Sequence, residues 1–200
     1  MLANELTHTE VRIDPRVKRT RKLLQQALIE LMAEKSFRSI TVRDIAARAT
    51  LNRVTFYAHF ADKQALLENT IRELIQERLR NQLPEGSTFS PDNLARLILT
   101  TCEFVAEMDQ HCPPPHGQME PLMEKQIKTE LFAILRAWLT SLPSEQAKHS
   151  APAEQAAMVS SWGIYGAVVQ WNQQKRTIPA ADFVEQVLPL ILPSFQPTTR

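Results

Sequence analysis

Cysteine and glycine are scarce in this sequence. Two cysteines and four glycines occur among 200 residues. Two cysteines are too few for a disulfide framework, and the HCPPPH segment around Cys112 lacks the paired ligand spacing of a structural zinc site. The glycines form no loop of the kind that binds phosphate groups. We therefore expect no metal, no cofactor and no disulfide, and we interpret Cys102 as a core thiol and Cys112 as a loop thiol.

Proline and glycine are both absent between residues 16 and 83, so nothing in this segment interrupts a helix. Beyond it, prolines recur at intervals that separate segments of helical length. Apolar residues follow a spacing of three and four, and no alternating pattern typical of strands competes with it. Three such series are Leu24, Ala27, Leu28 and Leu31; Leu94, Ile98, Thr101, Val105 and Met108; and Ile127, Leu131, Leu135, Trp138 and Leu142. The sequence predicts an all-α protein.

Long hydrophobic runs are also missing. The first residues contain no apolar run of the signal-peptide type, and the longest uncharged stretch, about residues 155 to 174, is interrupted by Ser, Gln and Asn. With 44% hydrophobic residues, the chain is long enough to bury a sizeable core. We expect a soluble, cytoplasmic protein with no membrane partner.

The net charge of +1 hides an uneven distribution. Residues 12–63 contain 12 Lys or Arg against 5 Asp or Glu, a net charge of +7, whereas residues 64–200 contain 11 against 15, a net charge of -4. A strongly basic segment is suited to an anionic partner such as nucleic acid. We therefore expect two domains, residues 1–63 with a basic N-terminal arm and residues 64–200, of which the first binds the anion.

Two short helices joined by a tight turn are predicted within residues 41–60. Thr41 is a good first residue for a helix, and Asp44 three residues later completes a capping pair. The letters TLN then turn the chain, and RVTFYAHF forms a second helix in which Phe56 and Phe60, four residues apart, belong to the core. Inside a basic segment, this is the sequence form of a helix-turn-helix, whose second helix enters the DNA major groove.

These residues resemble the TetR family of bacterial transcriptional regulators, in which a TVRDIA stretch, a short turn, an aromatic-rich TFYxHF and a following DK recur in this order. The close resemblance covers about residues 18 to 70. It implies an N-terminal three-helix domain with a helix-turn-helix, followed by a larger helical dimerisation and effector-binding domain. One departure is Thr50, at a turn position where the family usually has glycine. A β-branched residue disfavours a positive φ, so we expect a slightly reshaped turn.

The resemblance also implies which side chains contact DNA. Those on base edges are Arg43, Arg53, Val54 and Thr55, and those on phosphates are Tyr57, His59 and Lys63. The chemistry agrees, because arginine can donate two hydrogen bonds to guanine, valine offers an apolar surface to a thymine methyl, and the last three donate to phosphate oxygens. Without the motif, Tyr57 would be interpreted as a core aromatic residue and His59 as a solvated surface residue.

Two further residues complete the expected DNA-binding set. Thr41 begins the first helix of the motif, and Arg19 represents the basic cluster RVKRTRK upstream of it. Such a charge run is either a solvated face or a contact to phosphates and the minor groove, and the neighbouring motif favours neither strongly.

Two stripes of different side-chain size are predicted on the helix AAMVSSWGIYGAVVQW of the second domain. The small stripe contains Ala156, Ser160, Gly163 and Ala167, and the bulky stripe contains Met158, Trp162, Tyr165 and Val169. Small residues let another helix approach closely. We hypothesise that the small stripe, with Phe183 and Val187 of the last helix, forms a four-helix dimer interface. The alternative is close packing within one subunit.

The bulky stripe would then face an effector pocket with adaptable methionine walls. The expected lining residues are Phe104, Met108, Met119, Met123, Trp138, Trp162 and Tyr165. A stripe of methionine and aromatic residues is also typical of an ordinary core.

Together these features predict a homodimeric, sequence-specific DNA-binding transcriptional regulator, most simply a repressor that a small molecule releases from an inverted-repeat operator. An activator, or a regulator controlled by a protein partner, is the alternative, and the latter would have a dry, fully packed second domain. A helical enzyme is a remote alternative, because no nucleophile, base and orienting group are spaced as a motif. A scaffold that binds only proteins would not need the segment of +7 charge. We expect no catalytic residue.

Overall fold

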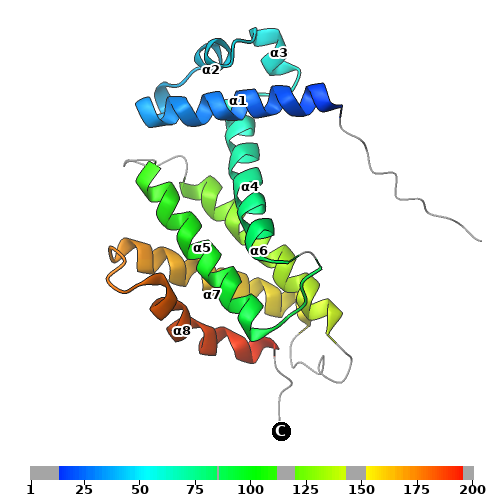
Figure 1. Cartoon of the computed structure of the whole chain (residues 1–200), viewed down its shortest axis with the longest axis vertical. Coiled ribbons are helices and arrows are strands. Elements are labelled where there is room, and N and C mark those ends of the chain that lie inside the picture. Colours follow the sequence, from blue (N-terminus) through cyan, green and yellow to red (C-terminus); the bar gives the residue numbers. More distant parts are fainter. Residues whose placement is uncertain (1–13, 85, 112–119, 143–151, 196–200) are drawn as a thin grey trace, which may run out of the picture. The chain divides into compact units, whose positions relative to one another are not determined.

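The computed structural model describes residues 14–84, 86–111, 120–142 and 152–195 (Figure 1). Over these ranges the chain forms eight α-helices and two short 3-10 helices, with no strand. The predicted all-α fold is therefore confirmed. The chain divides into two compact units, residues 1–67 and 68–200, and the division falls inside one long helix, α4 (Lys63–Gln82).

The first unit is built on α1 (Pro15–Glu34). A short 3-10 helix, η1 (Phe37–Ser39), leads into α2 (Val42–Arg48), which contacts α1, and α2 in turn contacts α3 (Arg53–Tyr57). Figure 1 shows the short helices α2 and α3 against the long α1. Helix α4 begins in this unit and continues into the second.

Side chains that accept backbone hydrogen bonds explain where these helices begin. Asp14 accepts from the N–H of Arg16 at 2.8 Å, and Pro15 occupies the first turn, where no N–H is needed. Asn52 caps α3 by accepting from Thr55 N at 2.7 Å, and Asp62 caps α4. Each helix thus starts where a short polar side chain satisfies an otherwise unpaired donor.

The core of the first unit uses the apolar positions expected from the spacing. Phe56 is fully buried, its ring meets that of Phe60 at 6.1 Å, and Phe60 lies just beyond the end of α3. The other buried apolar residues of the helices in this unit include Leu24, Ala27, Leu28, Leu31, Ile45 and Ala46. Burial of these side chains is the main stabilising term for so small a unit.

The second unit contains α5 (Pro91–His111), α6 (Glu120–Ser141), α7 (Ala153–Gln173), α8 (Ala180–Ile191) and η2 (Leu192–Phe195). Helix α7 contacts both α5 and α6, while α8 packs on α5 and α7 (Figure 1). Their shared core includes Leu97, Ile127, Leu135, Ile164 and Val168. The rest of α4 contributes Ile75 and Leu79 to the same core.

Candidate nucleic-acid interface and ligand cavity

The turn between α2 and α3 keeps a left-handed residue at Thr50. Its φ is 57°, and the turn is closed by backbone hydrogen bonds from Thr50 N to Ala47 O and from Leu51 N to Ala46 O. The turn is therefore not reshaped, and the threonine takes the conformation that glycine adopts more readily. For a residue with a Cβ atom this conformation costs about 1 to 2 kcal/mol, which the surrounding core must offset.

Helix α3 presents a short row of exposed side chains. Val54 is 79% exposed and Tyr57 is 57% exposed, although both are large apolar or aromatic residues, and Arg53 beside them is also exposed. Phe56, on the opposite side, is buried, and its ring packs edge-on against that of Tyr57. The buried phenylalanine thus fixes the orientation in which α3 offers its outer face.

The other expected DNA-binding side chains differ in how much they are exposed. Arg19 on α1 and Arg43 on α2 are exposed, and neither has an ion-pair partner among the residues that the structure describes. Thr55 and His59 are half-buried, and the Thr55 hydroxyl donates to Asn52 Oδ1 at 3.0 Å. Asn52 therefore orients the Thr55 side chain, whose hydroxyl oxygen can still accept a hydrogen bond.

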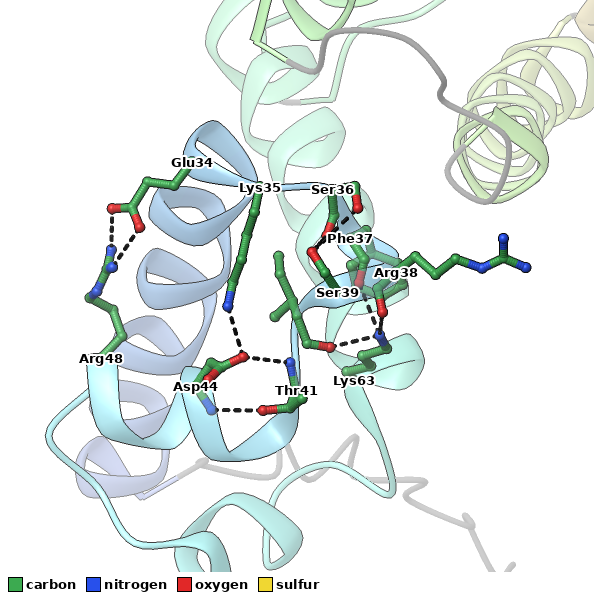
Figure 2. A network of polar contacts seen from close by, with 11 residues as sticks. Glu34, Lys35, Ser36, Phe37, Arg38, Ser39, Thr41, Asp44, Arg48 and Lys63 are labelled. Atoms are coloured by element: carbon green, nitrogen blue, oxygen red, sulfur yellow. Dashed lines mark hydrogen bonds and ion pairs between the residues drawn. The ribbon is translucent and has the colours of Figure 1, made fainter.

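Thr41 and Asp44 form a reciprocal cap at the start of α2, as the sequence predicts (Figure 2). Thr41 Oγ1 accepts from Asp44 N at 3.1 Å, and Asp44 Oδ2 accepts from Thr41 N at 3.0 Å. Lys35 donates to the same carboxylate oxygen at 2.9 Å. The hydrogen bond from Lys35, followed by those from Thr41, lowers the pKa of Asp44 from its ordinary value of 3.8 to about 2.

Lys63 lies in a different environment from the one that a phosphate contact requires. Its ammonium donates to three backbone carbonyl oxygens, those of Phe37 at 2.9 Å, Arg38 at 3.2 Å and Ile40 at 2.7 Å (Figure 2). It also lies 4.7 Å from the centre of the Phe37 ring. Burial lowers its pKa from the ordinary value. All three donors of this ammonium are used inside the unit, so the expected phosphate contact does not match the geometry.

An ion pair that the sequence does not reveal holds α2 on α1. Arg48 donates through Nη1 and Nη2 to the two carboxylate oxygens of Glu34, at 2.9 and 2.8 Å (Figure 2). Glu30, one helical turn earlier, adds a third oxygen at 3.6 Å from Arg48 Nη1. A two-pronged contact of this kind fixes orientation as well as distance. It explains why Arg48, although basic and in the motif, is directed to α1.

Replacing Asp44 with asparagine should reveal the contribution of its charge. Asparagine can still accept from Thr41 N, so the change removes mainly the ion pair with Lys35. The folded state lowers this pKa, so the stabilisation is fully present above about pH 3.8 and is lost as the pH falls through about 2. We expect Asp44→Asn to be less stable than the wild type at neutral pH and to converge with it near pH 2 in urea titrations.

The matched control for this charge effect is Asp62→Asn. Asp62 caps α4 through Ala65 N at 2.8 Å but forms no ion pair within the part of the chain that the structure describes. A stability difference of equal size for both variants would show that the ion pair with Lys35 contributes nothing.

A cavity of about 320 Å³ opens in the second unit between α5, α6 and α7. Three of the expected pocket residues line it, namely Met108, Met123 and Tyr165. The other lining residues are Val105, Asp109, Glu120, Ile127, Val169, Asn172, Gln173 and Lys175. The polar lining residues give no signal in the sequence, because methionine and aromatic side chains indicate only the apolar wall of a pocket.

Three other expected pocket residues lie elsewhere. Phe104 is buried in the core, and Trp138 is buried there too, with its indole N–H donating to Ser87 O at 2.8 Å. Trp162 is 60% exposed, and the Lys128 ammonium lies 3.3 Å from its ring centre. Met119 lies outside the described residues. Phe104, Trp138 and Trp162 therefore do not line this cavity.

On α7 the structure buries part of the small stripe inside one chain and leaves Gly163 exposed. Ala156 and Ser160 are buried within the chain itself, Ala167 packs on the core, and a Cβ atom on Gly163 would lie 3.4 Å from Ile191 Cδ1 of α8. Phe183 and Val187 of α8 are buried in the same core. The small stripe allows α8 to approach α7 closely inside one subunit, which was the alternative interpretation.

An apolar surface is left exposed on α7 and α8. Met158, Val159 and Trp162 of α7 are exposed, and Leu190 of α8 is 76% exposed. Gly166, one turn beyond Trp162, has no atom within 4 Å of the position that a Cβ would take. We call these five residues the α7–α8 surface.

Two further tests concern the described residues alone. No group of three or more His, Cys, Asp or Glu side chains able to hold a metal ion occurs among them. None of the helices built from them is both long and apolar enough to cross a membrane.

Comparison with known proteins places the first unit in a family. Residues 24–70 match the model of the bacterial regulatory proteins of the tetR family. Over 69 residues the chain is 42% identical to the uncharacterized HTH-type transcriptional regulator YxbF of Bacillus subtilis. This match covers 34% of the chain and 18% of that relative, so it concerns less than a fifth of the relative's length.

Solved structures extend the similarity in fold to both units. FadR of Thermus thermophilus, a TetR family repressor solved with lauroyl-CoA, superposes with a TM-score of 0.61 at 19% identity, over 90% of this chain and 97% of that one. FadR of Bacillus subtilis, solved with stearoyl-CoA, gives 0.58 at 20% identity, over 86% and 98%. The helix-turn-helix and the family match over it lead to one conclusion: residues 24–70 form a DNA-binding domain of the tetR family of bacterial regulatory proteins, and the all-helical fold of both units is similar to that of solved TetR family regulators.

Proposed function

We propose that the protein is a homodimeric repressor that binds an inverted-repeat operator and is released from it by a small molecule. The observation that carries this proposal is the exposed row on α3, where Val54 and Tyr57 remain uncovered on the second helix of a helix-turn-helix. Two large side chains exposed together on one short helix form an apolar patch that a partner can cover. The partner that fits a segment of +7 charge is DNA.

The exposed side chains divide into two roles in this proposal. Arg43, Arg53 and Val54 meet base edges, with the arginines on guanine and the valine on a thymine methyl. The remaining contacts are to phosphates and hold the domain in register. They come from Arg19, Thr41, Thr55, Tyr57 and His59. Lys63 leaves this set, and we assign it the structural role that its three carbonyl contacts support.

Selection of binding sites from random double-stranded DNA tests the proposal. A two-fold dimer presents α3 twice, so the selected site should be an inverted repeat whose half-sites are about one helical turn apart or a small multiple of it. Recovery of a single asymmetric half-site, bound tightly by a monomer, would contradict both the dimer and the operator form.

Arg53→Ala and Arg19→Ala should separate sequence recognition from backbone binding. Loss of the arginine fork on α3 should cost about 1 to 3 kcal/mol on the selected site and flatten the preference at one base pair of each half-site. Arg19→Ala should weaken binding to all sequences alike and lower the salt dependence of the affinity. Quantitative binding to the selected site and its single-base variants, at several salt concentrations, measures both effects.

The control for these variants is Arg96→Ala, which removes an exposed arginine of α5 in the second unit. It should leave the affinity and the base preference unchanged. If Arg53→Ala lowers the affinity without any change in base preference, the assignment of Arg53 to a base edge is wrong.

A second copy of the chain is the occupant that we propose for the α7–α8 surface. Of the large hydrophobic side chains exposed among the described residues, half lie on α1 and α3 and the other half are Met158, Val159, Trp162 and Leu190. Their concentration on two packed helices, with the small Gly166 beside Trp162, suits close approach of the same two helices from a symmetry mate. The small stripe serves a different purpose, since it packs within each subunit.

The cavity supports control by a small molecule over control by a protein partner, because the second unit is not fully packed. Two similar regulators were solved with acyl-CoA molecules, which supports a small organic effector in this fold. A ligand acts only through a difference in its affinity for the DNA-bound and released states. Helix α4 supplies a physical route, since Lys63 ties its first residue to η1 and Gln76 donates to Glu130 of the cavity-lining α6 at 2.8 Å.

A further inference from the structure

The cavity has an apolar wall and a polar end. Val105, Ile127, Val169 and the two methionines supply the apolar wall. The polar end contains Asp109 of α5, Glu120 of α6, and Asn172 and Tyr165 of α7. Its volume of about 320 Å³ is at the lower limit of the range of ligand pockets, about 300 to 1,000 Å³. The cavity therefore suits a small molecule with an apolar body and one polar group.

Asn172 indicates that the polar group of the ligand is a hydrogen-bond donor. Its Oδ1 atom is buried and accepts no hydrogen bond from any residue that the structure describes. A buried acceptor without a partner destabilises the state that contains it, and a ligand that donates a hydrogen bond there removes this penalty. A carboxylate, which only accepts, cannot do so.

The charges around the polar end also favour a hydrogen-bond donor in the ligand. Asp109 is 3.9 Å from Arg176 Nη2, which offsets part of its charge, and Lys175 is an exposed lining residue. Glu120 lines the cavity with no ion-pair partner among the described side chains. The neighbouring Glu124 is bound by Lys128 at 2.6 Å. Among the residues that line the cavity, two carboxylates, those of Asp109 and Glu120, thus face one cation, Lys175.

Tyr165 lies in the same negatively charged environment. Its pKa is raised to about 12, first by burial and then by the negative charges of Glu124 and Glu120. The phenol therefore stays neutral at physiological pH. The same negative charges that raise this pKa favour a positively charged group in a ligand.

We propose that the cavity binds a small apolar amine, with its protonated nitrogen donating to Asn172 Oδ1 near Glu120 and its apolar body against the methionine wall. This inference rests on the proposed function of the cavity as the effector site and names the ligand class. It separates this chain from regulators whose effectors are anionic, since a fatty carboxylate brings negative charge to the carboxylates and leaves Asn172 without a donor, and the phosphates of a coenzyme A thioester bring negative charge as well.

Three probes that differ only in the polar group test the proposal, namely octylamine, octanol and octanoate. Calorimetric titration of the full chain, without DNA, should give octylamine an affinity at least about 10-fold higher than octanoate, with octanol between them, because a charge-assisted hydrogen bond is the stronger kind. Equal or tighter binding of octanoate, or no binding of octylamine, overturns the proposal.

Variants at Asn172 assign the effect to this residue. Asn172→Leu should remove most of the preference for octylamine over octanol, and Asn172→Asp, of almost the same shape, should increase it. Gln174→Leu, an exposed change just beyond α7 that does not line the cavity, is the matched control. Circular dichroism of each variant establishes folding. If neither Asn172 variant changes the preference in folded protein, the assignment fails.

Release of DNA is measured separately, with octylamine added to the complex of the protein and its selected site. Binding of octylamine without release supports the ligand class and contradicts the effector role of the cavity. Octylamine binding that also releases the DNA supports both. A protein that binds its selected site but no octylamine contradicts the ligand class alone.

Discussion

Trp162→Glu is expected to convert the proposed dimer into a folded monomer and to abolish tight binding to the selected operator. Trp162 is 60% exposed in one subunit, and it is the largest side chain of the α7–α8 surface. Buried tryptophans at the centre of an interface commonly contribute about 2 to 4 kcal/mol each, and two-fold symmetry applies the loss twice. The dimer dissociation constant should therefore rise by at least about 1,000-fold.

The monomer should remain folded, because the substitution lies on the outside of α7. The Lys128 ammonium that now lies over the Trp162 ring is close enough to pair with the new carboxylate. Operator binding should be lost although the substituted residue is remote in sequence from α3, since one subunit holds only one half-site. Sedimentation equilibrium and operator binding measured on the same preparation test both statements.

Ala133→Glu is the matched control for this variant. Ala133 is exposed on α6, so the change adds the same charge to another helix of the same unit, outside the proposed interface. The control should stay dimeric and bind the operator. A dimeric Trp162→Glu would show that the second copy does not cover this surface.

Lys63→Met should destabilise the first unit by about 1.5 to 3 kcal/mol, the usual range for a hydrogen bond that involves a charged group. Methionine keeps much of the side-chain length but leaves the carbonyl oxygens of Phe37, Arg38 and Ile40 without their shared donor. These carbonyls lie in the segment that leads into α2, so its loosening also disturbs the cap at Thr41. The loss of stability is measured by urea unfolding of a fragment of residues 1–67 and of the full chain, monitored by far-ultraviolet circular dichroism.

Lys18→Met is the control, since it removes an exposed lysine of α1 in the same unit. It should change the stability by much less. A Lys63→Met protein with wild-type stability and a lowered salt dependence of DNA binding would return Lys63 to the phosphate-contacting set.

The local parts of the fold could be predicted from the sequence. The cap of Thr41 and Asp44 and the burial of Phe56 depend on residues within one or two turns, where spacing and side-chain chemistry decide the outcome. The left-handed Thr50 shows the limit of this approach. Its conformation is unfavourable for its residue type, and the packing of α2 and α3 determines it nonetheless.

The contacts that could not be predicted join distant residues. Lys63 reaches carbonyls 23 to 26 positions earlier, and a basic residue beside a DNA-binding motif gives no sign in the sequence that its charge is used internally. On α7 the size of side chains showed that one face is packed closely, but size does not distinguish a helix of the same chain from one of another. Ala156 and Ser160 belong to the first case because they are buried within the same chain, whereas Gly163 is exposed although Ile191 lies close by.

The placement of the tryptophans has a spectroscopic consequence. All three tryptophans, Trp138, Trp162 and Trp171, lie in the second unit, and Tyr57 is the one tyrosine of the first. Indole emission therefore follows the second unit alone, and unfolding of the DNA-binding helices leaves it unchanged. Two of the indoles are buried and donate to backbone carbonyls, at Ser87 and Ile178, whereas Trp162 faces solvent in the single subunit. Trp162 is thus the tryptophan expected to emit at the longest wavelength. If the proposed second copy covers it, this emission should shift to shorter wavelength with rising protein concentration, which would be a label-free signal of subunit association.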